Sequence, residues 1–209
     1  MVSAASAGVM TAGIILFVAL FASSFIFGRL WCGFFCPFGA IQEFSSYVLD
    51  KSAKGGKYDN LKYLFFIIFF AAVFFAAYSA GGFSRIDLFY DPPGGPVPYL
   101  IYYLFVGVFA VLPLFFGRRA GCHYVCWMAP FMMLGRRISN FLGLPVLKLE
   151  ADGVRCGHCL LCKKACSMSL DIYSRVQAGS MEHPECLLCG RCVHNCPQRV
   201  IKYAFKGKK

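Results

Sequence analysis

Few side chains in this sequence carry a charge, and over long stretches none does. Charged residues make up 15% of the 209 residues, whereas 58% are hydrophobic and 17% are aromatic. Soluble globular domains carry about 25% charged residues, so this composition excludes an ordinary soluble domain. Residence in a membrane is the interpretation that the composition favours.

Several kinds of redox or catalytic site are also missing. The four histidines stand outside the long apolar stretches, which argues against haem b held by two histidines (His123, His158, His183, His194). A C-x-x-C-H motif is absent, which argues against attached c-type haem. No general base or nucleophile stands with a supporting partner, so we expect substrate chemistry to reside in another protein.

Three apolar stretches, at about 7–27, 61–80 and 98–116, are long enough to cross a bilayer. The first has no basic residues before it and is too long for the core of a signal peptide, so we interpret it as a transmembrane helix. The mixed stretches 38–49 and 127–147 are expected to be interfacial helices, and a short fourth span at 127–147 is the alternative. Residues 1–147 are therefore predicted to form an all-α membrane domain with three or possibly four transmembrane helices.

The distribution of basic residues predicts the orientation in the membrane. Residues 28–62 hold five Lys or Arg, the loop 81–97 holds one, and arginines follow the third stretch at 118, 119, 136 and 137. The positive-inside rule then predicts a multi-pass inner-membrane protein with a cytoplasmic C-terminal region. The formal charge of +11 needs no nucleic acid partner, because bound clusters would lower it and the C-terminal lysines can rest on anionic lipid.

An internal repeat is visible in the membrane part. Residues 28–37 are echoed by 117–126, and both cysteines of a C-x3-C pair recur after an offset of 90. Two i, i+4 pairs on the same membrane face can aim four sulfurs at one point, which predicts a [4Fe–4S] or [2Fe–2S] centre there. Inert packing cysteines are the alternative. Arg29 and Arg118 are expected to offset the charge of this centre. Its candidate ligands are Cys32, Cys36, Cys122 and Cys126.

The region 148–209 carries the pattern C-x2-C-x2-C-x3-C twice, with the second run followed by Pro197. This spacing is typical of bacterial ferredoxins with two [4Fe–4S] clusters, in which the fourth cysteine of each run ligates the other cluster. It therefore predicts a cytoplasmic α+β ferredoxin domain, whereas zinc knuckles and disulfides rarely use such tandem runs. We assign Cys156, Cys159, Cys162 and Cys196 to the first cluster, and Cys186, Cys189, Cys192 and Cys166 to the second.

These motifs together resemble the NapH family of membrane iron–sulfur proteins, which is related to the membrane parts of NosR-type and CcoG-type proteins. The resemblance rests on G-R-x-x-C-G-x-x-C-P-x-G at 28–39, the second C-x3-C pair and the ferredoxin runs. It implies a quinol-linked electron-transfer component in which all twelve cysteines hold clusters. The chain departs from the family in lacking the usual extra N-terminal span and in having Ser167 where proline is usual.

The predicted function is therefore the relay of single electrons between cytoplasmic clusters and the C-x3-C face, to or from quinone or a partner subunit. The chain would then be part of an oxidoreductase complex of the quinol dehydrogenase type. A different hypothesis is a metal-reducing or assembly factor, because soft thiolates suit Cu(I). A structural subunit whose cysteines bind zinc is a third hypothesis. The loop 81–97 either roofs a quinone pocket, docks a partner, or is a plain connection.

Overall fold

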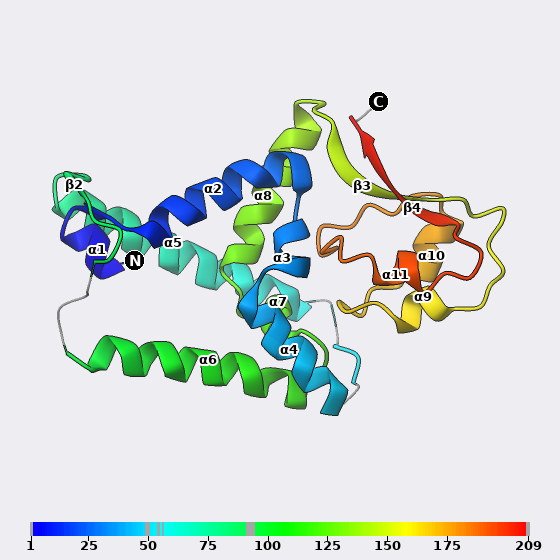
Figure 1. The fold of residues 1–209 in the computed structure, drawn as a ribbon, viewed down its shortest axis with the longest axis horizontal. Helices are drawn as coiled ribbons and strands as arrows, with labels where there is room; N and C mark the ends of the chain where they lie inside the picture. Colours follow the sequence, from blue (N-terminus) through cyan, green and yellow to red (C-terminus); the bar gives the residue numbers. More distant parts are fainter. Residues whose placement is uncertain (1, 49–50, 54, 56, 91–94, 208–209) are drawn as a thin grey trace.

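The computed structural model describes residues 2–48, 51–53, 55, 57–90 and 95–207. Long apolar helices form one part of the molecule, and the cysteine-rich C-terminal part lies at one end of them (Figure 1). The N-terminal helix α1 (Val2–Ser6) and the loop strand β2 (Arg85–Ile86) lie together at the opposite end. The observed C-terminal part and the N-terminus are thus far apart in the fold.

Two helices in the described part of the chain are long and apolar enough to cross a membrane. One is α5 (Leu61–Ser79), which with most of the preceding η1 (Lys57–Asn60) forms a span of 22 residues, Tyr58–Ser79, and the other is α6 (Val97–Phe116) with 20 residues. Their side chains are mostly apolar and exposed, with 11% of the most apolar stretch of each buried. Exposed apolar surface of this extent is typical of contact with lipid or with a partner protein.

The first predicted span is shorter than expected. Helix α2 (Ala12–Phe27) has 16 residues, which corresponds to about 24 Å, less than the ~30 Å of a bilayer core. The prediction of a helix from about residue 7 was wrong because Gly8 adopts a left-handed conformation (φ 66°) after α1. The strand β1 (Val9–Met10) then pairs in parallel with β2, so the region predicted as an all-α membrane domain is not entirely α-helical.

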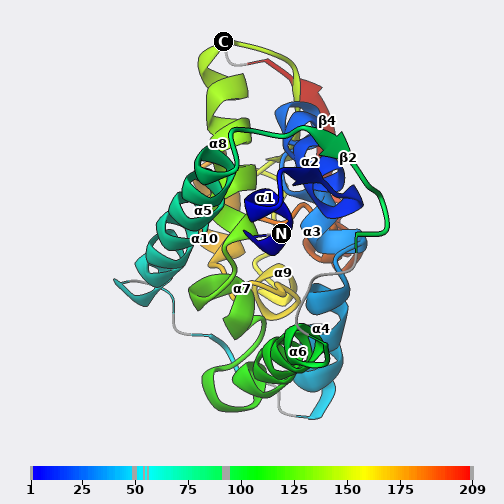
Figure 2. The same cartoon turned by 90° about the vertical axis from the view of Figure 1, so that its left-hand side faces the viewer.

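The long-helix part contains two sets of helices in the same order. Helices α2, α3 (Leu30–Phe34) and α4 (Pro37–Val48) form the first set, and α6, α7 (Ala120–Tyr124) and α8 (Met128–Phe141) form the second, with α5 between the two sets. Helix α2 packs on α8 and α4 packs on α6, and the end-on view of Figure 2 shows α4 behind α6. The long helix of each half therefore contacts the third helix of the other half. These reciprocal contacts fit a pseudo-twofold repeat. The number of membrane spans in the repeat stays a prediction.

Small residues allow the helices to approach closely. A Cβ atom at Gly135 would lie 1.9 Å from Ser24 Oγ, so α8 and α2 can pack at this distance only with glycine there. The rings of Phe17 and Phe131 stack beside this contact with centroids 4.2 Å apart. On the other side, Ser45 Oγ of α4 donates a hydrogen bond of 3.1 Å to the carbonyl oxygen of Ala110 in α6.

The C-terminal part has the predicted mixture of helices and strands. Strands β3 (Val146–Ala151) and β4 (Ile201–Lys206) pair antiparallel, with Val146 opposite Lys206 and Ala151 opposite Ile201. Between them lie three short helices, α9 (Leu161–Lys164), α10 (Ile172–Gln177) and α11 (Arg191–His194). Strand side chains and α10 form a small apolar core around the cysteines. The domain boundary predicted after residue 147 stays a prediction, and β3 begins just before it.

Candidate iron–sulfur site

The two cysteine runs adopt the same backbone conformation. His158 and Leu188 have φ of 54° and 55°, and Leu160 and Gly190 have φ of 59° and 73°. Each left-handed pair flanks the second cysteine of its run, and a one-turn helix follows, α9 in the first run and α11 in the second. Left-handed residues turn the chain sharply. The three closely spaced cysteines of each run are therefore wrapped around one point.

Each of two small cavities in the C-terminal part is lined by four cysteines. Their other walls are mainly apolar, which suits a cluster that must be kept from water. The cysteines lining the first cavity are Cys156, Cys159, Cys162 and Cys196, and those lining the second are Cys166, Cys186, Cys189 and Cys192. The fourth cysteine of each run thus lies with the other run, as the crossed ligation predicts.

Burial raises the pKa of Cys166 to about 11 and that of Cys192 to about 12, with neighbouring cysteines adding to the shift at Cys192. These thiols would be protonated near neutral pH, so a cluster has to displace their protons on binding. Within the described residues, no three His, Cys, Asp or Glu side chains converge tightly enough for a single metal ion. A cubane is compatible with this wider spacing, because each thiolate binds its own iron.

The structure also brings the two C-x3-C pairs together. Cys32 lies in α3 and Cys122 in α7, and the second cysteine of each pair stands two positions after the last residue of its helix. Cys122 and Cys126 both lie close enough to interact electrostatically with Cys32 and Cys36. Cys122 is buried and the other three are half-buried. Four thiols from the two halves therefore share one place, which fits a single metal cluster.

Gln42 is a residue of this site that sequence reasoning missed. It is fully buried on α4, and its Nε2 lies 3.5 Å from Cys122 Sγ. Its Oε1 accepts a hydrogen bond of 2.8 Å from the backbone N–H of Gly121. A glutamine of the first half therefore fixes the cysteine helix of the second half. The only sequence signal was a polar residue in the middle of a predicted interfacial helix.

The C-x3-C face contacts the second cysteine run of the C-terminal part. A Cβ atom at Gly33 would lie 2.8 Å from the carbonyl oxygen of Leu187 and 3.2 Å from Cys189 Cβ. His123 Nε2 lies 3.1 Å from the carbonyl oxygen of Met168 and, because that oxygen only accepts, donates to it. Residues of both regions form one apolar cluster, which consists of Cys122, Met168 and Leu187 with Cys32, Cys166, Leu170 and Cys189 at its edge.

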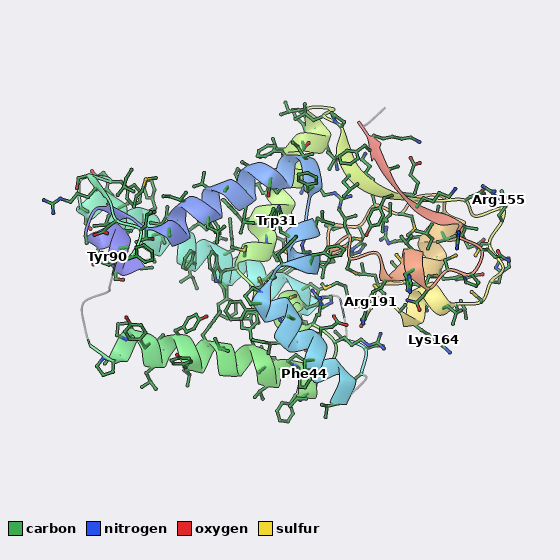
Figure 3. All side chains as sticks on the ribbon, viewed as in Figure 1. Trp31, Phe44, Tyr90, Arg155, Lys164 and Arg191 are labelled. Carbon is green, nitrogen blue, oxygen red and sulfur yellow. The ribbon has the colours of Figure 1, made fainter. Side chains whose placement is uncertain are left out.

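Two carboxylates join the two parts through ion pairs. Glu185 lies between Arg29, at 3.0 Å, and Lys62, and all three side chains are buried. Glu43 lies between Arg119, at 3.0 Å, and Arg191, which Figure 3 shows on the side of the C-terminal part that faces α4. Burial alone would raise the pKa of Glu185, but Arg29 and Lys62 outweigh it and hold that pKa below its usual value. Glu185 is therefore ionised at neutral pH.

The structure adds a third arginine, Arg119, to the two that were predicted near the C-x3-C cysteines. Arg29 lies within electrostatic range of Cys32 and Cys122, as expected. Arg118 donates a hydrogen bond of 2.6 Å to the carbonyl oxygen of Lys164 in the C-terminal part, and its predicted role at the centre stays a prediction. Arg119 donates to the carbonyl oxygen of Cys32 at 3.1 Å and interacts with both cysteines. The chain turns at Arg119 (φ 53°), so the two neighbouring arginines face different partners.

Comparisons with known proteins agree with this arrangement. Residues 9–54 and 98–145 match a family described as a 4Fe-4S binding domain, and residues 155–201 match one described as a 4Fe-4S dicluster domain. The regulatory protein NosR of Stutzerimonas stutzeri is 26% identical over 213 residues. The chain is an iron–sulfur protein related to NosR. Its domains indicate 4Fe–4S clusters and a role in electron transfer.

The match with NosR covers 90% of this chain and 27% of NosR. Two uncharacterized proteins of Methanocaldococcus jannaschii are also similar. MJ0749 is 26% identical over 87% of this chain and 66% of its own length, and MJ0750 is 24% identical over 98% and 82%. No solved structure matches the chain. These comparisons do not single out NapH, so the narrower assignment stays a prediction.

Proposed function

We propose that the chain is an integral membrane protein that relays single electrons between two [4Fe–4S] clusters in its ferredoxin part and a third iron–sulfur centre at the membrane face. Bound clusters would supply the one-electron chemistry. The twelve cysteines would hold them in the three groups of four that line the two cavities and the C-x3-C site. The remaining side chains position these groups and keep water away from them.

The contact between Gly33 and the loop Leu187–Cys189 is the observation that carries this proposal. It places the C-x3-C cysteines directly against the second ferredoxin run, with apolar side chains between them. A relay requires redox centres that lie close together with no water between them. The protein contributes by holding the centres in these positions. The two buried ion-pair groups around Glu185 and Glu43 support the same contact from both sides.

The arrangement of the ends supports the proposed topology. The N-terminal strand β1 pairs with β2 at one end of the long helices, and the ferredoxin part lies at the other end (Figure 1). If α5 and α6 cross the membrane, these ends face opposite sides. The positive-inside rule then assigns the ferredoxin part to the cytoplasm and the β1–β2 pair to the outside of the inner membrane.

A cavity of about 500 Å³ supports quinone as one partner of the relay. It lies beside Tyr124 and Val125, which stand between the cysteines of the second pair, and its walls are mostly apolar residues of α5 and α6. Lys51 and the tyrosines Tyr58 and Tyr124 supply polar groups at its edge. Such a mixture suits an apolar molecule with a carbonyl at one end. A redox partner protein is the other proposed acceptor or donor.

Electron paramagnetic resonance of the purified full-length protein tests the relay. Reduction in steps should give signals broadened by coupling between neighbouring centres, because the C-x3-C site touches the second ferredoxin run. Replacing Cys36 with serine should remove this coupling and leave the two ferredoxin signals in place. A spectrum that does not change would contradict the proposal. Exchangeable copper on these thiols, in place of iron with sulfide, would favour the metal-handling alternative.

A further inference from the structure

A second large cavity lies where α8 meets the ferredoxin part, and none of the twelve cysteines lines it. It has a volume of about 440 Å³ and is bordered by the start of α5, one face of α8 and the loop 182–184. The walls combine apolar residues, among them Pro130, Met133 and Leu134, with Arg136, Arg137 and His183. Nothing described above uses this cavity.

Two buried polar atoms of residues that border the cavity lack partners. Arg136 is 7% exposed, and its Nη1 is buried without a hydrogen-bond partner. Asn140 Oδ1 is likewise buried and without a partner. Neither Arg136 nor Arg137 forms an ion pair with another residue in the described ranges. A buried guanidinium without a partner is costly, so this arrangement favours a ligand that carries negative charge.

Two further groups define the chemistry of that ligand. His183 Nδ1 accepts the backbone N–H of Glu185 at 3.1 Å, so its Nε2 carries the hydrogen and can donate to a ligand. Glu182 also borders the cavity, but its carboxylate pairs with Lys148 at 2.9 Å and so is compensated. The site therefore offers cationic and N–H donors for an oxyanion.

We propose that this cavity binds the phosphate of an anionic phospholipid headgroup. Arg136 and Arg137 lie on the side of the phosphate oxygens, and His183 Nε2 donates a hydrogen bond to one of them. The volume exceeds what a free phosphate fills, and the apolar residues of α8 and Tyr63 of α5 remain for the first part of the acyl chains. The bound headgroup would join α8 to the loop that leads into Glu185 and Cys186.

Arg136 also lies within electrostatic range of Cys186. It can therefore offset the negative charge of a cluster there as well as bind a ligand. Arg137 separates the two roles because it is exposed at the cavity and is not among the main charges acting on that cysteine. The matched control is Arg155, an exposed arginine paired with Asp152 at 2.6 Å in the ferredoxin part. Arg137→Gln and Arg155→Gln remove the same charge, and only the first touches the cavity.

Native mass spectrometry of the full-length protein tests this proposal with phosphatidylglycerol, phosphatidylcholine and inorganic phosphate as probes. The wild type should retain one phosphatidylglycerol in preference to phosphatidylcholine. Arg137→Gln should lower that retention at least about fivefold, while Arg155→Gln leaves it unchanged. Equal retention of both lipids, no effect of Arg137→Gln, or competition by millimolar inorganic phosphate with no lipid retained would overturn it.

The inference rests on the proposed membrane location, and the two can fail separately. If the chain stays in solution without detergent, the membrane location is wrong and the lipid site falls with it. If the chain needs detergent but shows no preference for the anionic lipid, only the lipid site is wrong. In both variants the cluster signals should match those of the wild type, so a loss of lipid cannot be attributed to a lost cluster.

Discussion

Arg29 and Glu185 form an ion pair of 3.0 Å although 156 positions separate them in the sequence. Arg29 stands between α2 and α3, and Glu185 directly precedes the cluster cysteine Cys186. Lys62 forms a second ion pair with the other carboxylate oxygen of Glu185. Because Glu185 is the shared anion for two buried cations, the docking of the two parts depends on it.

Glu185→Gln should therefore destabilise the protein strongly. It leaves Arg29 and Lys62 buried without their anion, a change that typically costs about 3–5 kcal/mol. Glu182→Gln is the control, since Glu182 is largely exposed and its pair with Lys148 contributes only ~0–1 kcal/mol. Denaturant-induced loss of cluster absorbance measures both. Equal midpoints for the two variants would show that the buried pair does not hold the parts together.

Gly33→Ala should push the C-x3-C face away from the second cysteine run. The added Cβ would come within 2.8 Å of the Leu187 carbonyl oxygen, and overpacking of this kind costs about 1–3 kcal/mol. The spin coupling between neighbouring centres should weaken while the iron content stays the same. Gly107→Ala in α6 meets no atom within 4 Å and should leave the coupling unchanged. Unaltered coupling in Gly33→Ala would place the relay contact elsewhere.

Gln42→Leu should shift the reduction potential of the C-x3-C centre. The change removes the only described side-chain hydrogen-bond donor at 3.5 Å from Cys122 Sγ, and hydrogen bonds to sulfur ligands raise the potential. We expect a more negative midpoint in a potentiometric titration, with the ferredoxin midpoints unmoved. Ser45→Ala on the same helix removes the bond to Ala110 and touches no cysteine, so it should shift none of the midpoints. A shift in Ser45→Ala of the same size would mean that packing of α4, and not the bond to sulfur, sets the potential.

Cys166→Ser tests the crossed ligation. Cys166 lines the cavity of Cys186, Cys189 and Cys192, so its loss should damage the second ferredoxin cluster. Cys196→Ser should damage the first, because Cys196 lines the other cavity. The two variants therefore act as each other's control in electron paramagnetic resonance. If each serine instead removed the cluster of its own run, the crossed arrangement would be wrong.

Local patterns in the sequence predicted much of the fold. The helices α5 and α6 follow from long apolar runs, and α4 and most of α8 follow from mixed stretches beside them. The grouping of the twelve cysteines into three sets of four follows from their spacing in the sequence. The start of α2 was missed because Gly8 and a two-residue strand leave no periodic signal, and pairing with Arg85–Ile86 decides that structure.

The contacts between the parts could not be predicted in this way. Glu185, Glu43 and Gln42 act on partners at least 76 positions away, and such pairs leave no trace in local spacing. A carboxylate directly before a cluster cysteine was the one available hint, since a buried anion there requires cations from elsewhere. Arg119 was not predicted at the site because its side chain reaches Cys32 only through the left-handed turn of the chain at Arg119 itself, which the sequence does not signal.

Iron and acid-labile sulfide per polypeptide test the central claim most directly, namely that Cys32, Cys36, Cys122 and Cys126 jointly hold a third cluster. The intact protein should contain about twelve irons if that cluster is a cubane, or about ten if it is a [2Fe–2S] centre. Cys122→Ser should lower the content to about eight and leave both ferredoxin signals unchanged. About eight irons in the wild type as well, with four thiols of the membrane part titrating freely, would contradict the account.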